Sequence, residues 1–145
     1  MTIITSASLP TDVRITGTKT SPQVLLTTPP TQFDGGPVVI EFTAEYLNHL
    51  PAAGTQLNGI GIDLMVDGVR VERIALAGTH STNNDFWPIA IRDVLDTAPR
   101  LIPAGEHTIG LAVWRWSPDQ DGYLTAHPGY VTGWGMPMRL TVYAA

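Results

Sequence analysis

Apolar and polar residues alternate with a period of two in three long stretches of the chain. These stretches cover residues 38–46, 60–66 and 107–116. A period of two is typical of a β-strand with one buried face and one solvated face. Shorter apolar stretches that also suit strands cover residues 13–15, 24–26 and 138–142. No segment combines helical periodicity with helix-capping residues over ten or more positions, so the pattern predicts an all-β protein.

The connections between these stretches carry strong turn signals. Asp67-Gly68 separates the stretch that ends at Val66 from a second predicted strand over residues 69–76, and Asp-Gly favours the two-residue turn of a β-hairpin. Residues 78–85 and 117–135 are expected to form loops, the second with the option of a distorted hairpin. Residues 89–95 fit a strand or a short helical turn, and their β-branched content favours the strand.

Proline and glycine divide the chain near residue 33. Residues 1–32 are rich in Thr, Ser and Pro and contain only short apolar pieces, which predicts an extended N-terminal arm. Pro29-Pro30 and the Asp34–Pro37 stretch then prevent a helix from continuing into residues 33–145. A chain of 145 residues has the length of one domain. We therefore predict a single antiparallel β-sandwich over residues 33–145, jelly-roll-like, preceded by the arm.

Composition excludes several classes of function. The chain has no Cys, so it has no disulfide framework, thiol nucleophile or thiolate zinc site. Its net charge is −5, with only 14% charged residues, which argues against nucleic-acid binding. The apolar runs are too short to insert into a membrane, and the first residues do not resemble a secretory signal.

The polar residues suggest no recognisable active site or metal site. There is no Gly-x-Ser-x-Gly motif. The four histidines lack the spacing of metal ligands, and the Asp119–Gly122 stretch lacks the distal Glu of a calcium loop. We therefore expect no enzyme activity, no metal and no cofactor. A small hydrolase that uses carboxylates remains an alternative, and its candidate residues are Glu41, Glu45 and Asp63.

Aromatic residues gather in the last third of the chain. Trp114 and Trp116 share one face of the strand predicted over residues 107–116, opposite the face of Ile109, Leu111 and Val113. Indole and phenol rings suit interfaces because they combine a large rigid area with one polar group. Burial within the subunit and a sugar-binding platform are the two alternatives. The candidate interface or ligand-binding residues are Trp114, Trp116, Tyr123, His127, Tyr130 and Trp134.

Three segments resemble strands of β-sandwich proteins from the virions of tailed bacteriophages. The most specific is Pro103-Ala104-Gly105-Glu106-His107-Thr108-Ile109, which resembles a Pro-x-Gly-x-His-Thr strand opening. Val66-Asp67-Gly68-Val69 and Pro137-Met138-Arg139-Leu140-Thr141-Val142-Tyr143 are similar to other strands of these domains. The resemblance covers roughly residues 33–143.

The resemblance implies a non-enzymatic structural protein of the phage particle, of the minor tail, tail-fibre or capsid-decorating type. Such proteins are commonly homotrimers attached to other virion proteins through an N-terminal segment, and they are made in the host cytoplasm. The chain has no long fibrous shaft, which favours a small accessory subunit. The alternative is a module that binds carbohydrate or a host receptor, with a host surface glycan as its partner.

Overall fold

The computed structural model describes residues 2–50, 59–78, 87–116, 121–125 and 138–145. Within these ranges the regular structure consists of β-strands. The strands are β1 (Ile3–Leu9), β2 (Val13–Arg14), β3 (Gln23–Thr27), β4 (Thr31–Asp34), β5 (Val38–Leu50), β6 (Gly59–Val66), β7 (Val69–Gly78), β8 (Trp87–Leu95), β9 (Ala104–His107), β10 (Ile109–Arg115), β11 (Asp121–Thr125) and β12 (Met138–Ala144). The predicted all-β fold class is confirmed.

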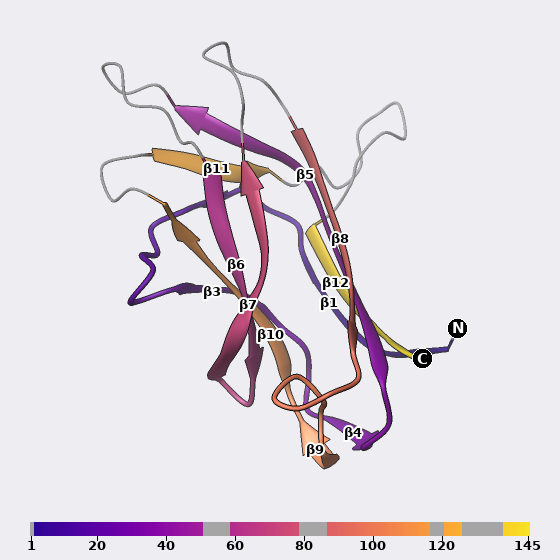
Figure 1. The fold of residues 1–145 in the computed structure, drawn as a ribbon. Helices are drawn as coiled ribbons and strands as arrows, with labels where there is room; N and C mark the ends of the chain where they lie inside the picture. The colour runs from indigo at the N-terminus through magenta and orange to yellow at the C-terminus, as the bar shows by residue number, and fades with distance from the viewer. Residues whose placement is uncertain (1, 51–58, 79–86, 117–120, 126–137) are drawn as a thin grey trace, which may run out of the picture.

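Two antiparallel sheets face each other and form the sandwich (Figure 1). Sheet A has the strand order β1-β12-β5-β11-β2, with β8 along the other edge of β5. Sheet B has the order β3-β10-β6-β7, and β4 and β9 form a small separate sheet at one end of the sandwich. Strand β5 is long enough to pair with β12 through its first half and with β11 through its second half.

Inward-facing aliphatic side chains from both sheets form one core. On β6 and β10 they are every second residue, as the two-residue period predicts, because successive side chains of a strand point to opposite faces. Each large aliphatic side chain that is removed from water contributes about 1.5–3 kcal/mol. Core residues from these two strands are Ile60, Ile62, Leu64, Ile109, Leu111 and Val113.

The N-terminal segment is extended, as expected, but it is not a separate arm. Strand β1 pairs with β12 in sheet A, and β3 pairs with β10 in sheet B. Ile15, Leu25 and Leu26 are buried in the core. These apolar residues gain more from burial than from exposure on a detached segment. The boundary predicted between residues 32 and 33 is therefore wrong, because residues 3–27 supply edge strands to both sheets.

Most local predictions agree with the structure. The Asp67-Gly68 turn joins β6 to β7, and its φ angles of 52° and 76° are those that this turn type requires. Residues 87–95 form strand β8 rather than a helical turn. The long strand predicted over residues 107–116 is divided at Thr108, since His107 belongs to β9 and Ile109 begins β10. Residues 121–125 form β11 inside the predicted loop.

Candidate functional site

The structure tests two of the six aromatic-region candidates. Trp114 and Trp116 lie at the end of β10 and just beyond it, and both side chains are described. Tyr123 lies on β11, paired with Arg14 and Asn48, but its side chain is outside the described part. His127, Tyr130 and Trp134 lie outside the described residues.

Trp114 points away from the core, as predicted, and yet it is buried. Its side chain is only 4% exposed. The ring lies against Gly61 of the neighbouring strand, so closely that a Cβ atom added there would be 2.0 Å from Cε2 of the indole. The indole Nε1 donates a hydrogen bond to Oδ1 of Asp63 at 3.1 Å. Trp114 is therefore part of a buried cluster within the subunit, which was one of the two alternatives to an interface, and it is not an exposed contact residue.

Asp63 is the centre of this cluster. It is 0% exposed although it faces outward from sheet B, and its Oδ2 lies 2.8 Å from Nε of Arg70. This contact is an ion pair whose geometry does not meet the criteria of a directed hydrogen bond. Arg70 also donates from Nη1 to the backbone oxygen of Lys19 at 3.1 Å. The Arg70 side chain thus connects the buried carboxylate to the segment between β2 and β3.

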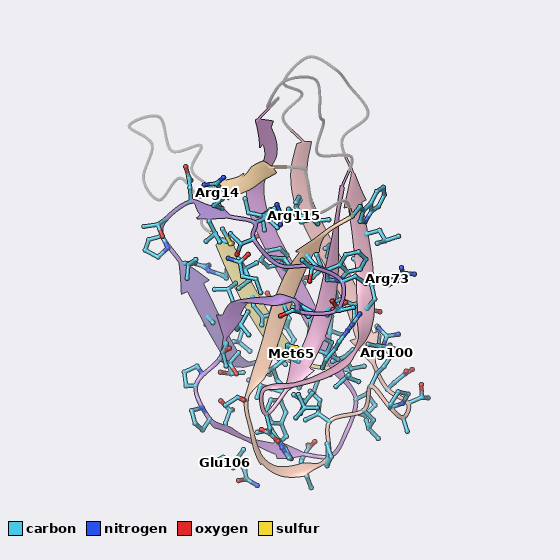
Figure 2. All side chains as sticks on the ribbon, turned by 90° about the vertical axis from the view of Figure 1, so that its left-hand side faces the viewer. Arg14, Met65, Arg73, Arg100, Glu106 and Arg115 are labelled. Carbon is cyan, nitrogen blue, oxygen red and sulfur yellow. The ribbon has the colours of Figure 1, made fainter. Side chains whose placement is uncertain are left out.

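The segment that follows the buried Ile15, over residues 16–22, lies on the outer side of sheet B. Figure 2 looks onto this sheet, with the segment in front of it and Arg14 and Arg115 at the same end. The backbone N–H of Arg115 donates to the oxygen of Gly17 at 3.0 Å. The backbone N–H of Thr16 donates to Oε1 of Gln23 at 2.8 Å. Together with the Arg70 bond to Lys19, these contacts hold the segment over the Asp63 carboxylate.

This geometry gives the Trp114–Asp63–Arg70 cluster a structural role. A buried carboxylate is stable when a cation and hydrogen-bond donors satisfy it, and here the indole and the guanidinium do so. The carboxylate has no exposed surface through which a substrate could reach it. The cluster fixes the covering segment to sheet B.

The structure separates two of the three carboxylates of the hydrolase alternative, Glu41 and Asp63. Asp63 projects from the outer side of sheet B, whereas Glu41 projects from the outer side of sheet A. Glu41 pairs there with Nη1 of Arg92 at 3.1 Å and accepts a hydrogen bond from the hydroxyl of Tyr143 at 3.3 Å. The two groups lie on opposite faces of the sandwich and cannot act on one glycosidic bond. The side chain of Glu45 lies outside the described part.

Trp116 is the described aromatic candidate that remains on the surface. Its side chain is 44% exposed. Its backbone N–H donates to the oxygen of Gly59 at 3.3 Å, which fixes the residue next to the start of β6. The end of β5, the start of β6 and the end of β7 lie at the same end of the sandwich (Figure 1). Trp116 is therefore an exposed indole on a backbone that is held by the sheet.

His107 lies at the opposite end of the molecule and pairs with the β6–β7 turn. Its Nδ1 is 2.7 Å from Oδ2 of Asp67, and Oδ1 of Asp67 accepts the backbone N–H of Thr108 at 2.9 Å. The hydrogen bond from His107 lowers the pKa of the Asp67 carboxyl the most, and the hydrogen bond from Thr108 adds to this effect. Together they hold this pKa below its ordinary value of 3.8. The described histidine thus fixes a turn to the start of β10.

Replacing Asp67 by Asn is expected to make stability less dependent on pH in the acidic range. Asn tolerates the positive φ of this position, so the turn is retained. Because the folded-state pKa of Asp67 is lowered, its stabilising contribution is present above 3.8 and disappears as the pH falls through the folded-state value. Urea unfolding from about pH 6 to about pH 2 measures this. Two curves that stay parallel over the whole range would contradict the assignment.

The described residues contain no group of three or more His, Cys, Asp or Glu residues arranged to hold a metal ion. They also contain no helix that is long and apolar enough to span a membrane. His49 lies on β5 with its side chain outside the described part, and His80 and residues 119–120 of the calcium-like stretch are outside it altogether.

Comparison with known proteins supports the fold. No family model matches the chain, and no curated protein matches it. Among solved structures the chain is similar to the Eiger TNF protein of S. frugiperda, with a TM-score of 0.51 and 12% sequence identity. The similarity covers 100% of this chain and 94% of the other. At this identity it establishes the fold alone, a jelly-roll-like antiparallel β-sandwich.

Proposed function

We propose that this chain is a non-enzymatic structural protein of a bacteriophage particle, a minor tail or capsid-decorating subunit that works by presenting a binding surface. The specific assignment to a virion comes from the strand segments around Pro103–Ile109 and the C-terminal strand, which resemble those of phage β-sandwich proteins. The proposal includes self-assembly, as a homotrimer, and a location in the particle after synthesis in the host cytoplasm.

The exposed indole of Trp116 is the observation that carries the binding role. The outward position of this ring is held by a backbone hydrogen bond to Gly59, and 44% of the side chain is exposed. Exposing a large aromatic ring costs a subunit stability that burial would provide. Contact with another molecule recovers this loss, which is why aromatic residues are enriched at the centres of interfaces.

Attachment to the particle does not require a free N-terminal arm. The backbone of β1 is paired with β12 along one edge, and β3 is paired with β10. We therefore place the attachment surface on the folded sandwich and not on residues 1–32. Adding a detached strand to a neighbour would require β1 to leave sheet A and would lose this pairing.

Two measurements on the purified full chain test the proposal. Mass spectrometry of purified particles of the phage that encodes the chain is expected to detect it as a component, and the isolated protein is expected to co-sediment with particles that lack it. Absence from the particles together with failure to co-sediment would overturn the virion assignment.

A carbohydrate-binding module is the second candidate, because an exposed indole on a fixed backbone also suits stacking against a sugar ring. Under this alternative, Trp116→Ala is expected to reduce glycan affinity by at least about tenfold, since one aromatic contact contributes about 1.4 kcal/mol or more. A glycan array followed by calorimetry measures this. Trp116→Phe, which keeps an aromatic face, serves as the control, and an array without any hits would count against the alternative.

A further inference from the structure

We infer that the outer face of sheet B carries a binding site for an anionic polysaccharide, one whose sugars bear sulfate or phosphate esters. The site consists of Lys19, Arg70 and Arg73, which we call the cationic patch. Such a site rests on the binding role proposed for the chain and gives that role a class of ligand.

Strand register places both arginines of the patch on the outer face of sheet B. In the pairing of β7 with β6, Arg70 lies opposite Met65 and Arg73 lies opposite Asp63. Met65 and Asp63 alternate with the core residue Leu64, so they and their partners point away from the core. Figure 2 looks onto this face and labels Arg73. The two arginines are therefore neighbours on one surface.

The covering segment brings the third cation to the same surface. Arg70 donates from Nη1 to the backbone oxygen of Lys19 at 3.1 Å, so the two residues are in contact. Lys19 lies at the tip of a tight turn in which the backbones of Thr18 and Ser21 exchange hydrogen bonds at 3.0 and 3.1 Å. Because this turn and the sheet fix the backbone of the patch, an anion that binds there orders only side chains.

The acidic side chains next to the patch are engaged by other partners, while two of its cations are not. Within the described part of the chain, neither Lys19 nor Arg73 has a carboxylate partner, and both residues are exposed. The patch therefore keeps two unmatched positive charges, although the whole chain has a net charge of −5. The neighbouring acids form the pairs Asp63–Arg70 at 2.8 Å, Glu72–Arg100 at 2.7 Å and Asp67–His107 at 2.7 Å.

The acids whose side chains are outside the described part belong to other elements. Glu45 lies on β5 and Asp121 lies on β11, and both strands are in sheet A. Asp85 and Asp119 lie in the segments that precede β8 and β11 in the sequence. None of the four is on β7 or on the covering segment, which carry the patch.

The donors of the patch fit an ester oxyanion. A guanidinium group presents a planar fork of N–H donors that matches the oxygens of phosphate or sulfate. The hydroxyl groups of Thr16, Thr20 and Ser21 are exposed on the same segment as Lys19. Hydroxyl groups donate to ester oxygens and also bond to sugar hydroxyls. The surface thus combines the groups that an ester-bearing sugar requires.

A polysaccharide fits this surface better than a protein partner does. Centres of protein interfaces are depleted of charged residues and enriched in aromatic residues. The covering segment over residues 16–22 exposes only hydroxyl side chains and one lysine. A polymer with a charged group on successive sugars can contact several cations at once, and salt weakens such contacts.

Two arginines provide a matched test of the site. Arg73→Gln removes an exposed charge from the patch, whereas Arg139→Gln removes the same charge from the exposed side of β12 in sheet A. The full wild-type chain is expected to bind dextran sulfate at low ionic strength, measured by calorimetry. Arg73→Gln and Lys19→Gln are each expected to weaken this binding about five- to tenfold, because each removes one charge-assisted contact. Arg139→Gln is expected to leave the affinity unchanged.

Other ligands identify the source of the anionic group. Neutral dextran is expected not to bind, and a phosphorylated mannan is expected to compete with dextran sulfate. Sodium sulfate and sodium phosphate are expected to compete no better than sodium chloride at equal ionic strength. Equal binding of neutral dextran, or specific competition by the free ions, would overturn the assignment to an anionic polysaccharide.

Lack of binding to dextran sulfate, or equal losses of affinity in Arg73→Gln and Arg139→Gln, would overturn the site itself. Circular dichroism verifies that each variant is folded. Detection of the chain in phage particles reports separately on the proposed function. A chain that is found in particles but binds no anionic polysaccharide lacks this site and keeps the virion role, and the opposite pair of results removes the virion role alone.

Discussion

Gly61→Ala is expected to destabilise the protein by about 3 kcal/mol, because overpacking a closely packed site costs roughly 1–3 kcal/mol and more when nothing can move. The added methyl group would lie 2.0 Å from Cε2 of Trp114 and 2.6 Å from its Nε1. The indole cannot move away without losing its hydrogen bond to Asp63. For a domain of this size the expected fall in Tm is roughly 6–12 °C, measured by thermal unfolding.

A second variant shows whether the collision is the cause. In a Trp114→Leu background the ring is absent, so Gly61→Ala is expected to cost less than about 1 kcal/mol, and the double-mutant cycle gives the coupling between the two positions. Gly36→Ala is the control, since the nearest atom to its added methyl group is Oδ1 of the exposed Asp34 at 3.0 Å. An equal loss of stability at Gly61 in both backgrounds would show that Trp114 is not responsible.

The two-residue period predicted the strands because it reflects the geometry of the backbone. The alternation in residues 60–66 and 109–113 correctly placed the side chains that form the core. The Asp67-Gly68 turn was equally predictable, since few residues tolerate its φ angles. The N-terminal segment was misjudged because its strands are short and interrupted by proline, and their partners, β12, β11 and β10, are roughly 80 to 140 residues further along the chain.

The burial of the Trp114 side chain could not be predicted from the strand that carries it. The alternation correctly predicted the direction of the Trp114 side chain, but its exposure depends on two other strands, β6 and β7, and on a covering segment. A signal was present in Gly61 and Asp63, which alternate with core residues on β6 and leave room and an acceptor for an indole. Using that signal requires the register of β6 against β10, which a single sequence does not provide.

Asp63→Ala is also expected to destabilise the protein by about 3 kcal/mol, as much as Gly61→Ala. Removing one partner of a buried ion pair costs about 3–5 kcal/mol. The Arg70 side chain is 39% exposed and can regain water, which reduces that cost. The indole N–H of Trp114 remains buried without an acceptor and adds a penalty of about 1–3 kcal/mol. Urea unfolding monitored by tryptophan fluorescence measures the loss.

Asp63→Asn separates the two parts of this effect. The amide oxygen still accepts from Trp114 while the charge facing Arg70 is lost, so an intermediate cost of about 1–2 kcal/mol is expected. Arg70→Met keeps most of the packing volume but removes the bond to Lys19, and it is expected to increase proteolytic cleavage in residues 16–22. An Asp63→Ala variant as stable as the wild type would contradict the role of the cluster. Unchanged cleavage of the segment in Arg70→Met would do the same, because the cluster would then not be what holds the covering segment on sheet B.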